Sequence, residues 1–247
     1  MNKIVIVYQS LLGLYGDHGN AVVLAKRLLW RGIGAEIVTV DPGEPIPTDG
    51  LIYLLGGGED MAQVAAVAAL RADGGLAEAL KRGALIFGVC AGYQVLGHSF
   101  TVGERDEVQQ GLGVLDIETR RGPTRAIGEV LEHWTRGDTT TSLITGFENH
   151  AGYTKLGSDA KPLAKVEIGV GNCGDGFDGA VQGKVIGCYP HGPILPRNPQ
   201  LADWLLEQAL GQTLPRLDHP TNALHEALRA RRIHVARTTK DRALATR

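Results

Sequence analysis

Residues 84–94 read ALIFGVCAGYQ, and this stretch decides the fold. The unbroken apolar run from Ala84 to Val89 is typical of a strand buried on both faces. Small residues then flank Cys90 and a helical pattern follows, which is the layout of a tight strand-to-helix turn that exposes a nucleophile. Such turns lie at the carboxyl ends of parallel strands, where open α/β folds bind ligands. The stretch therefore predicts a parallel α/β fold with Cys90 at its active edge.

Strand-like and helical segments alternate on both sides of this turn. Strands are expected at 4–8, 35–40, 51–55 and 184–189, and helices at 20–29, 62–71, 76–82, 93–100 and 200–210. Asn20 is expected to cap the first helix, and the region 113–170 shows only shorter strand-like pieces. The alternation predicts a mostly parallel central sheet flanked by helices, in a single domain over 1–212, followed by a basic helical tail over 213–247.

The composition is that of an ordinary globular protein. The 247 residues carry a formal net charge of −2, and 43% of them are hydrophobic. This balance argues against general nucleic-acid binding, which needs a basic surface. No apolar run is long enough for a membrane span, and the N-terminus lacks a signal-peptide layout. The three cysteines form no CxxC pair, so we expect no disulfide framework and a reducing, cytoplasmic location.

Charge is distributed unevenly along the chain. Residues 216–247 carry eight Lys or Arg and three Asp or Glu, whereas the remainder has an excess of acidic residues. We interpret the tail as a solvated terminal helix. The alternative is a segment that docks on an acidic partner or a phosphorylated substrate.

Cys90 is the candidate nucleophile. Its flanking glycines allow the strand and the helix to approach closely, and the helix N-terminus is expected to favour the thiolate over the thiol. The alternative is a small cysteine packed in the core. A cysteine nucleophile needs a base, and His191 follows the apolar run 185–189, which places it at the same edge of the sheet. His150 is the second candidate for this role.

The triplet Gly56-Gly57-Gly58 follows the third expected strand. Backbone N–H groups there are placed to hold a tetrahedral oxyanion, and one such donor is typically worth about 2.7–4 kcal/mol. The alternative is a plain tight turn. The triplet lacks the GxxxxGK[ST] spacing of a phosphate loop, and no dinucleotide fingerprint is present elsewhere. No HExxH motif or His/Cys/Asp cluster predicts a metal site.

The chain resembles the triad (class I) glutamine amidotransferases in three features taken together. These are G-x-C-x-G-x-Q after a strand, a Gly-rich turn upstream, and a His after a late strand. Three further motifs look like the cobyric-acid-synthase-like branch, and within it most like the glutaminase subunits of lipid II isoglutaminyl synthases. These motifs are LGGGEDMAQ (55–63), FENHAGYT (147–154) and YPHGPILPRNP (189–199). The resemblance covers about residues 3–210.

The resemblance implies a set of roles. Cys90 attacks the side-chain amide of L-glutamine, and His191 transfers the protons. The other implied positions are an oxyanion hole at Gly57 and Ala91, and a glutamine pocket shaped by Gln94 and Gly58.

The carboxylate of glutamine needs a cation, and the segment 119–127 offers three arginines, at 120, 121 and 125. In the family an arginine of this segment holds the substrate, and Arg125 fits that place best. The alternative for each arginine is a solvated loop charge.

One position departs from the wider class, which usually carries Glu two residues after the histidine. Pro193 stands there, a loss that the cobyric-acid branch shares. Because its side chain cannot accept a hydrogen bond from the imidazole, we hypothesise that an acidic residue of a partner chain completes the site.

The chain also lacks a recognisable nucleotide-binding motif, whereas making an amide from a carboxylate and ammonia requires activation. The resemblance therefore implies a separate, ATP-dependent, Mur-ligase-like synthetase in a heterodimer, with ATP and Mg²⁺ on that partner and no cofactor in this chain. That partner would amidate the α-carboxyl of D-glutamate in the lipid II stem peptide to D-isoglutamine. Three alternatives stay open: a glutaminase subunit for a cobyrinate-type or other small-molecule synthetase, a stand-alone cysteine hydrolase, and a non-catalytic binding module.

Overall fold

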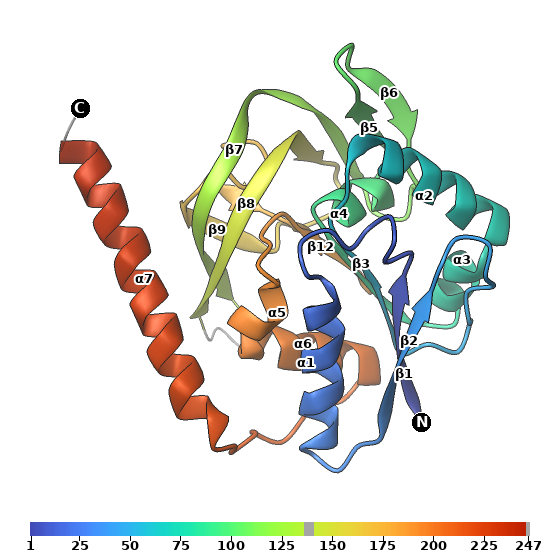
Figure 1. Ribbon diagram of the computed structural model, residues 1–247, viewed down its shortest axis with the longest axis horizontal. Helices are drawn as coiled ribbons and strands as arrows, with labels where there is room; N and C mark the ends of the chain where they lie inside the picture. The colour runs from blue at the N-terminus through green and yellow to red at the C-terminus, as the bar shows by residue number, and fades with distance from the viewer. Residues whose placement is uncertain (136–140, 246–247) are drawn as a thin grey trace.

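Two β-sheets organise the chain in the computed structural model, which describes residues 1–135 and 141–245 (Figure 1). The strands are β1 (Asn2–Val7), β2 (Ala35–Val40), β3 (Ile52–Leu55), β4 (Leu85–Val89), β5 (Ser99–Val102), β6 (Glu107–Gln110), β7 (Ile117–Thr135), β8 (Thr141–Leu156), β9 (Ala164–Ile168), β10 (Phe177–Asp178), β11 (Ala180–Gln182) and β12 (Val185–Cys188). The helices are α1 (His18–Leu29), α2 (Asp60–Asp73), α3 (Gly75–Lys81), α4 (Ala91–Leu96), α5 (Ile194–Arg197), α6 (Pro199–Leu210) and α7 (Thr221–Ala245).

The first sheet has the strand order β11-β12-β4-β3-β1-β2. Its strand pairs are parallel except for the edge pair β11–β12. Every residue of β3, β4 and β12 is buried, as expected for central parallel strands whose two faces are covered. Figure 1 shows α1 and α2 on opposite sides of β1 and β3. The predicted α/β fold, with a mostly parallel central sheet flanked by helices in a single domain, is confirmed.

The second sheet differs from the sequence-based expectation. In place of short pieces over 113–170, the structure has two long antiparallel strands, β7 and β8, which pair with each other and are joined in the same sheet by β5, β6, β9 and β10. Their register shifts between Arg121 and Ala126, so residues 122–125 form a bulge. This bulge lies beside the candidate site.

Two local expectations are wrong. The helix expected over 93–100 ends at Leu96, and 99–102 is a strand, because Gly97 leaves the helix in an extended conformation and packs so closely on Ile117 that a Cβ would lie 2.7 Å from its Cγ1. Asn20 does not cap α1 either. It lies inside the helix, buried, and its Oδ1 accepts a hydrogen bond from the Leu195 N–H at 2.9 Å.

The basic tail forms α7, which runs along the side of the second sheet in Figure 1. Arg229 is buried there and donates to the carbonyl oxygen of Leu143, and Arg237 forms an ion pair with Glu167 at 2.8 Å. The tail is a helix, as expected, but one of its faces packs on the domain and is not fully solvated. No helix within the described ranges combines the length and apolar character that a bilayer crossing needs.

Candidate active site

Three neighbouring strands of the first sheet end at one edge. In the register of the sheet, Cys188 of β12 lies beside Val89 of β4, and Gly88 of β4 lies beside Leu55 of β3. The residues that follow these strand ends are His191, Cys90 and the Gly56–Gly58 turn. Two hydrogen bonds tie the ends together: Cys90 N–H donates to the Cys188 carbonyl at 2.9 Å, and Gly92 N–H donates to the Gly56 carbonyl at 3.0 Å. The topology therefore brings the predicted nucleophile, base and Gly-rich turn to one edge.

Cys90 occupies a backbone conformation that is rare for a residue with a side chain. Its φ is 52° and its ψ is −104°, and such strain is characteristic of functional sites. The turn depends on the glycine beside it, because a Cβ on Gly92 would lie 2.2 Å from the carbonyl oxygen of Leu55. This is the close strand-to-helix approach that the flanking glycines predict.

The thiol of Cys90 is protonated at neutral pH. Burial raises its pKa to about 12, and the Ala91 N–H and the Arg125 cation only partly offset this, while the Asp17 charge adds to it. The Ala91 N–H at the start of α4 lowers the pKa of Cys90, as expected of a helix N-terminus, but desolvation of the buried sulfur is the larger effect and keeps the thiol protonated. A base must remove the thiol proton as the sulfur attacks.

His191 is suited to accept that proton. Its ring packs against Tyr15 with centroids 4.3 Å apart, and its Cε1 lies 2.7 Å from where a Cβ on Gly57 would be. Hydrogen bonds to Phe147, including His191 N–H to the Phe147 carbonyl at 2.8 Å, anchor its backbone to β8. Burial, followed by the charge of His150, lowers the pKa of His191 to about 4, so the imidazole is neutral at pH 7.

Neither ring nitrogen of His191 has a hydrogen-bond partner within the described ranges. The ring is therefore not hydrogen-bonded to the Cys90 thiol in this state, and no carboxylate of those ranges orients it. Pro193 packs against α1, where a Cβ on Gly19 would lie 2.7 Å from its Cγ. The residue that orients the imidazole therefore stays a prediction.

The N–H of Gly57 is already in use. It donates to Oδ2 of Asp17 at 2.8 Å, and Asp17 is a buried residue, 6% exposed. Burial raises the pKa of Asp17 to about 6, while the N–H groups of Gly57 and Tyr15 lower it. In this state Gly57 can hold an oxyanion only if Asp17 releases its N–H, so its predicted role stays a prediction. Sequence reasoning missed Asp17, because nothing in its flanking residues signals that it is buried.

A cavity of about 160 Å³ opens beside Cys90. Of the predicted residues, Cys90, Gln94, Gly58 and Arg125 line it, together with Arg121. Gln94 is held from two sides: it accepts from Gln63 Nε2 at 2.8 Å and donates to the Tyr189 hydroxyl at 3.1 Å.

The three candidate arginines separate in the structure. Arg125 lies on the bulge, lines the cavity and donates through Nε to Asn149 Oδ1 at 2.8 Å. Arg121 also lines the cavity, but its guanidinium is engaged by Asp106 and by the Gly103 carbonyl. Arg120 does not line the cavity and donates to Ser99 Oγ at 2.9 Å. Arg125 is therefore the cation best placed to meet a ligand.

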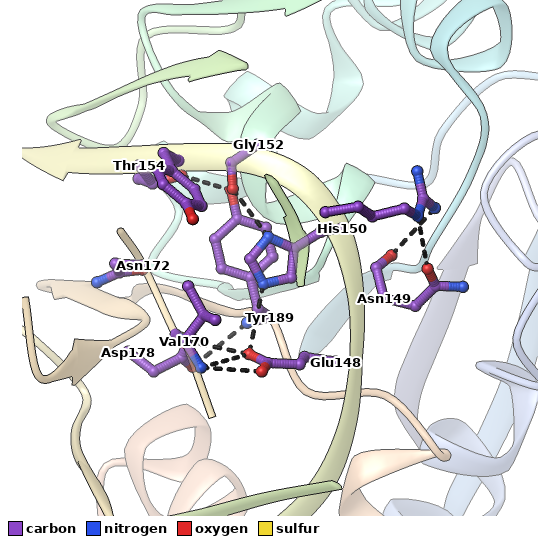
Figure 2. Close-up of polar contacts among 12 residues, drawn as sticks. Glu148, Asn149, His150, Gly152, Thr154, Val170, Asn172, Asp178 and Tyr189 are labelled. Atoms are coloured by element: carbon purple, nitrogen blue, oxygen red, sulfur yellow. Dashed lines mark hydrogen bonds and ion pairs between the residues drawn. The ribbon is translucent and has the colours of Figure 1, made fainter. Parts of the chain in front are cut away.

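His150 lines the same cavity. Figure 2 shows the residues around its ring. Its ring stacks on Tyr189 with centroids 3.6 Å apart, its Nδ1 lies 2.8 Å from the Gly152 carbonyl oxygen, and its Nε2 lies 3.7 Å from a carboxylate oxygen of Glu148. Glu148 is itself buried and accepts hydrogen bonds from the backbone N–H groups of Val170 and Gly171. The sequence analysis did not identify Glu148 as a site residue. The available signal was its position two residues before His150, because residues i and i+2 of a strand lie on the same face.

The chain is similar to known proteins in sequence and in fold. Residues 3–199 match the family model of the CobB/CobQ-like glutamine amidotransferase domain. The chain is 36% identical over 201 residues to the GatD subunit of lipid II isoglutaminyl synthase (glutamine-hydrolyzing) from Staphylococcus aureus strain N315, covering 80% of each chain. It is 37% identical over 183 residues to cobyric acid synthase from Sphingopyxis alaskensis, covering 70% of this chain and 34% of that enzyme. A crystal structure described as a glutamine amidotransferase matches with a TM-score of 0.55 and 25% identity, over 83% of this chain and 98% of the other.

Proposed function

The chain belongs to the CobB/CobQ-like glutamine amidotransferase family, and on that premise we propose that it is the glutaminase subunit of a lipid II-amidating enzyme. In this proposal it hydrolyses L-glutamine and passes ammonia to an ATP-dependent, Mur-ligase-like partner in the cytoplasm. That partner, which holds ATP and Mg²⁺, amidates the α-carboxyl of D-glutamate in the lipid II stem peptide to D-isoglutamine. The observation that carries the proposal is the edge where Cys90, His191 and the Gly-rich turn meet, in a chain whose match to the GatD subunit spans 80% of both proteins.

The proposed reaction begins with a neutral thiol and a neutral imidazole. His191 takes the proton of Cys90 as Sγ attacks the amide carbon of glutamine, and the amide oxygen becomes an oxyanion. N–H groups of the Gly-rich turn and of Ala91 stabilise that oxyanion. His191 then gives the proton to the amide nitrogen, the carbon–nitrogen bond breaks, and ammonia leaves a thioester on Cys90. Finally His191 deprotonates a water that attacks the thioester, which returns the thiol and releases glutamate.

Substrate binding follows from the cavity beside the nucleophile. The cation of Arg125, fixed by Asn149, is placed to receive the substrate carboxylate. Gln94 forms one wall and is held in a single orientation by Gln63 and Tyr189. Both roles are part of the proposal.

Among the residues that the structure describes, none hydrogen-bonds to the imidazole of His191, and this supports a site that is completed by a second chain. An acidic residue of the synthetase, brought to the ring on assembly, would fix its tautomer and stabilise the imidazolium that forms during the reaction. The isolated chain should therefore hydrolyse glutamine much more slowly than the complex. Equal rates for the isolated chain and the complex would contradict this part of the proposal.

The test is a coupled amidation assay. The chain is combined with the Mur-ligase-like chain of the same organism, lipid II, ATP, Mg²⁺ and glutamine labelled with nitrogen-15 in its amide. We expect the label in the α-amide of lipid II, measured by mass spectrometry. Cys90→Ser should abolish this transfer but leave amidation intact when ammonium chloride replaces glutamine.

Two outcomes would overturn the proposal. Glutamine consumption with unlabelled lipid II would indicate another acceptor, such as a cobyrinate-type substrate. Unchanged transfer by Cys90→Ser would show that the nucleophile is assigned incorrectly.

A further inference from the structure

The cavity beside Cys90 carries charges of both signs. Its lining includes the cations of Arg121 and Arg125 and the carboxylates of Glu59 and Asp60. Free glutamine is a zwitterion whose ammonium and carboxylate groups share the α-carbon, two methylene groups away from the amide carbon. When the amide reaches Cys90, both charged groups remain within this small cavity. The ammonium therefore needs an anion there, in addition to the cation that the carboxylate needs.

Of the two acidic residues in the lining, Asp60 is already engaged. Its Oδ2 accepts a hydrogen bond from the Gly103 N–H at 2.7 Å and lies 3.9 Å from a guanidinium nitrogen of Arg121. Asp60 thereby fastens the β5–β6 turn to the start of α2. A carboxylate used in this way has little capacity left for a ligand.

In the described part of the chain, the carboxylate of Glu59 is not used in a hydrogen bond or an ion pair of this kind. Glu59 follows the Gly-rich turn directly and is the N-cap residue of α2, where its backbone is extended. Its side chain makes no capping hydrogen bond. Within the described ranges its carboxylate has no hydrogen bond and no ion pair, although Arg125 lines the same cavity. A free carboxylate at the rim of a cavity is available to a cation that enters with the substrate.

The charges of Glu59 and Arg125 both act on the groups around the nucleophile. They influence the thiol of Cys90 and the phenol of Tyr15, and in each case with opposite sign: Glu59 raises the pKa and Arg125 lowers it. The two side chains therefore lie within electrostatic range of the reacting sulfur. This is the arrangement that a zwitterion requires, with one charge of each sign beside the cavity.

We propose that Glu59 is a specificity-determining residue that receives the α-ammonium group of L-glutamine while Arg125 receives its α-carboxylate. The assignment rests on the proposed glutaminase function. It implies that the site selects the free amino acid over amides that lack the ammonium group, such as glutaramate, the des-amino analogue of glutamine. A hydrogen-bonded charge pair of this kind corresponds to roughly 10- to 100-fold in binding.

The test compares two substrates in three proteins. Hydrolysis of L-glutamine and of glutaramate is measured for the full wild-type chain bound to its synthetase, for Glu59→Gln and for the control Glu104→Gln. Glu104 is an exposed carboxylate on the nearby β5–β6 turn that does not line the cavity, so it reports any long-range effect of losing one negative charge. Circular dichroism and thermal unfolding check that each variant is folded.

We expect Glu59→Gln to lower kcat/KM for L-glutamine by about 10- to 100-fold, mainly through KM, and to leave glutaramate hydrolysis within about threefold of wild type. Glu104→Gln should leave both substrates unchanged. An equal loss on both substrates, or no loss on either, overturns the assignment of Glu59 while the glutaminase function stands. Failure of the wild-type complex to hydrolyse glutamine overturns the proposed function itself.

Discussion

Replacing Gly57 by alanine should disable the site through a single methyl group. An added Cβ would lie 2.7 Å from both His191 Cε1 and Tyr15 Cδ2. Ordinary contacts begin at 3.4 Å, so the imidazole has to move by roughly 0.7 Å or more to make room. Gly57 does not have a positive φ, so the substitution acts through this collision and not through backbone strain.

The magnitude follows from the displacement. A misplacement of about 1 Å in a catalytic group costs on the order of 10²-fold in rate, and overpacking a buried position costs about 1–3 kcal/mol in stability. We therefore expect Gly57→Ala to lower kcat for glutamine hydrolysis about 100-fold in the complex. Thermal unfolding, followed in parallel, separates this loss of rate from a loss of folded protein.

Gly34→Ala is the matched control. Gly34 also lacks a positive φ, and its nearest neighbour to an added Cβ is Met1 Cγ at an unstrained 3.8 Å. This variant should keep wild-type activity. If folded Gly57→Ala hydrolyses glutamine within about threefold of wild type, the imidazole of His191 does not pack on the Gly-rich turn as described.

Three further perturbations probe the charged side chains in and around the site. Asp17→Asn should stabilise the chain at neutral pH: folding raises the pKa of Asp17 from 3.8 to about 6, so wild-type stability falls as the pH rises through this window, by about 3 kcal/mol in total. Urea unfolding should therefore show a gain for the variant near pH 7.5 and little gain below pH 4, and equal gains at both would refute the assignment. Arg125→Ala should raise KM for glutamine about 10- to 100-fold, whereas Arg120→Ala, outside the cavity, should not; indistinguishable KM values would remove Arg125 from the site. Glu148→Gln should lower stability by about 1–3 kcal/mol in thermal unfolding, because an amide keeps one acceptor oxygen and turns an NH2 donor toward the buried N–H groups of Val170 and Gly171, and an unchanged melting temperature would count against this.

The central sheet and the nucleophile turn could be predicted from the sequence because both leave local signals. A parallel strand that is buried on both faces is a continuous apolar run, as in 85–89, and the tight turn after it requires small residues around Cys90. His191 could be selected because the carboxyl ends of parallel strands lie at one edge of a sheet. That β12 and β4 are direct neighbours is a finding of the structure.

The second sheet left weaker signals. Strand β7 is exposed on much of its length and contains a bulge, and both β7 and β8 carry several Thr and Gly residues, so their sequence pattern resembles several short strands. The contact that ends α4 at Leu96 is made between Gly97 and Ile117, which are twenty residues apart in the chain. Such tertiary contacts override local helical patterns.

The electrostatics of the site could not be read from the sequence, because they depend on burial. The protonated thiol of Cys90, the neutral imidazole of His191 and the raised pKa of Asp17 all follow from the burial that the tertiary fold creates. For Cys90, the helix N-terminus considered alone predicts a lowered thiol pKa, whereas the net effect in the fold is a raised one.

The role of Cys90 is tested most directly by labelling the chain with a diazoketone analogue of L-glutamine and locating the adduct by mass spectrometry. We expect one adduct, on Cys90. Excess L-glutamine should prevent it, Cys90→Ser should abolish it, and His191→Asn should slow its formation. The other two cysteines, at 173 and 188, should remain unmodified. An active preparation that carries the adduct on either of them, or that carries none on Cys90, would contradict the account.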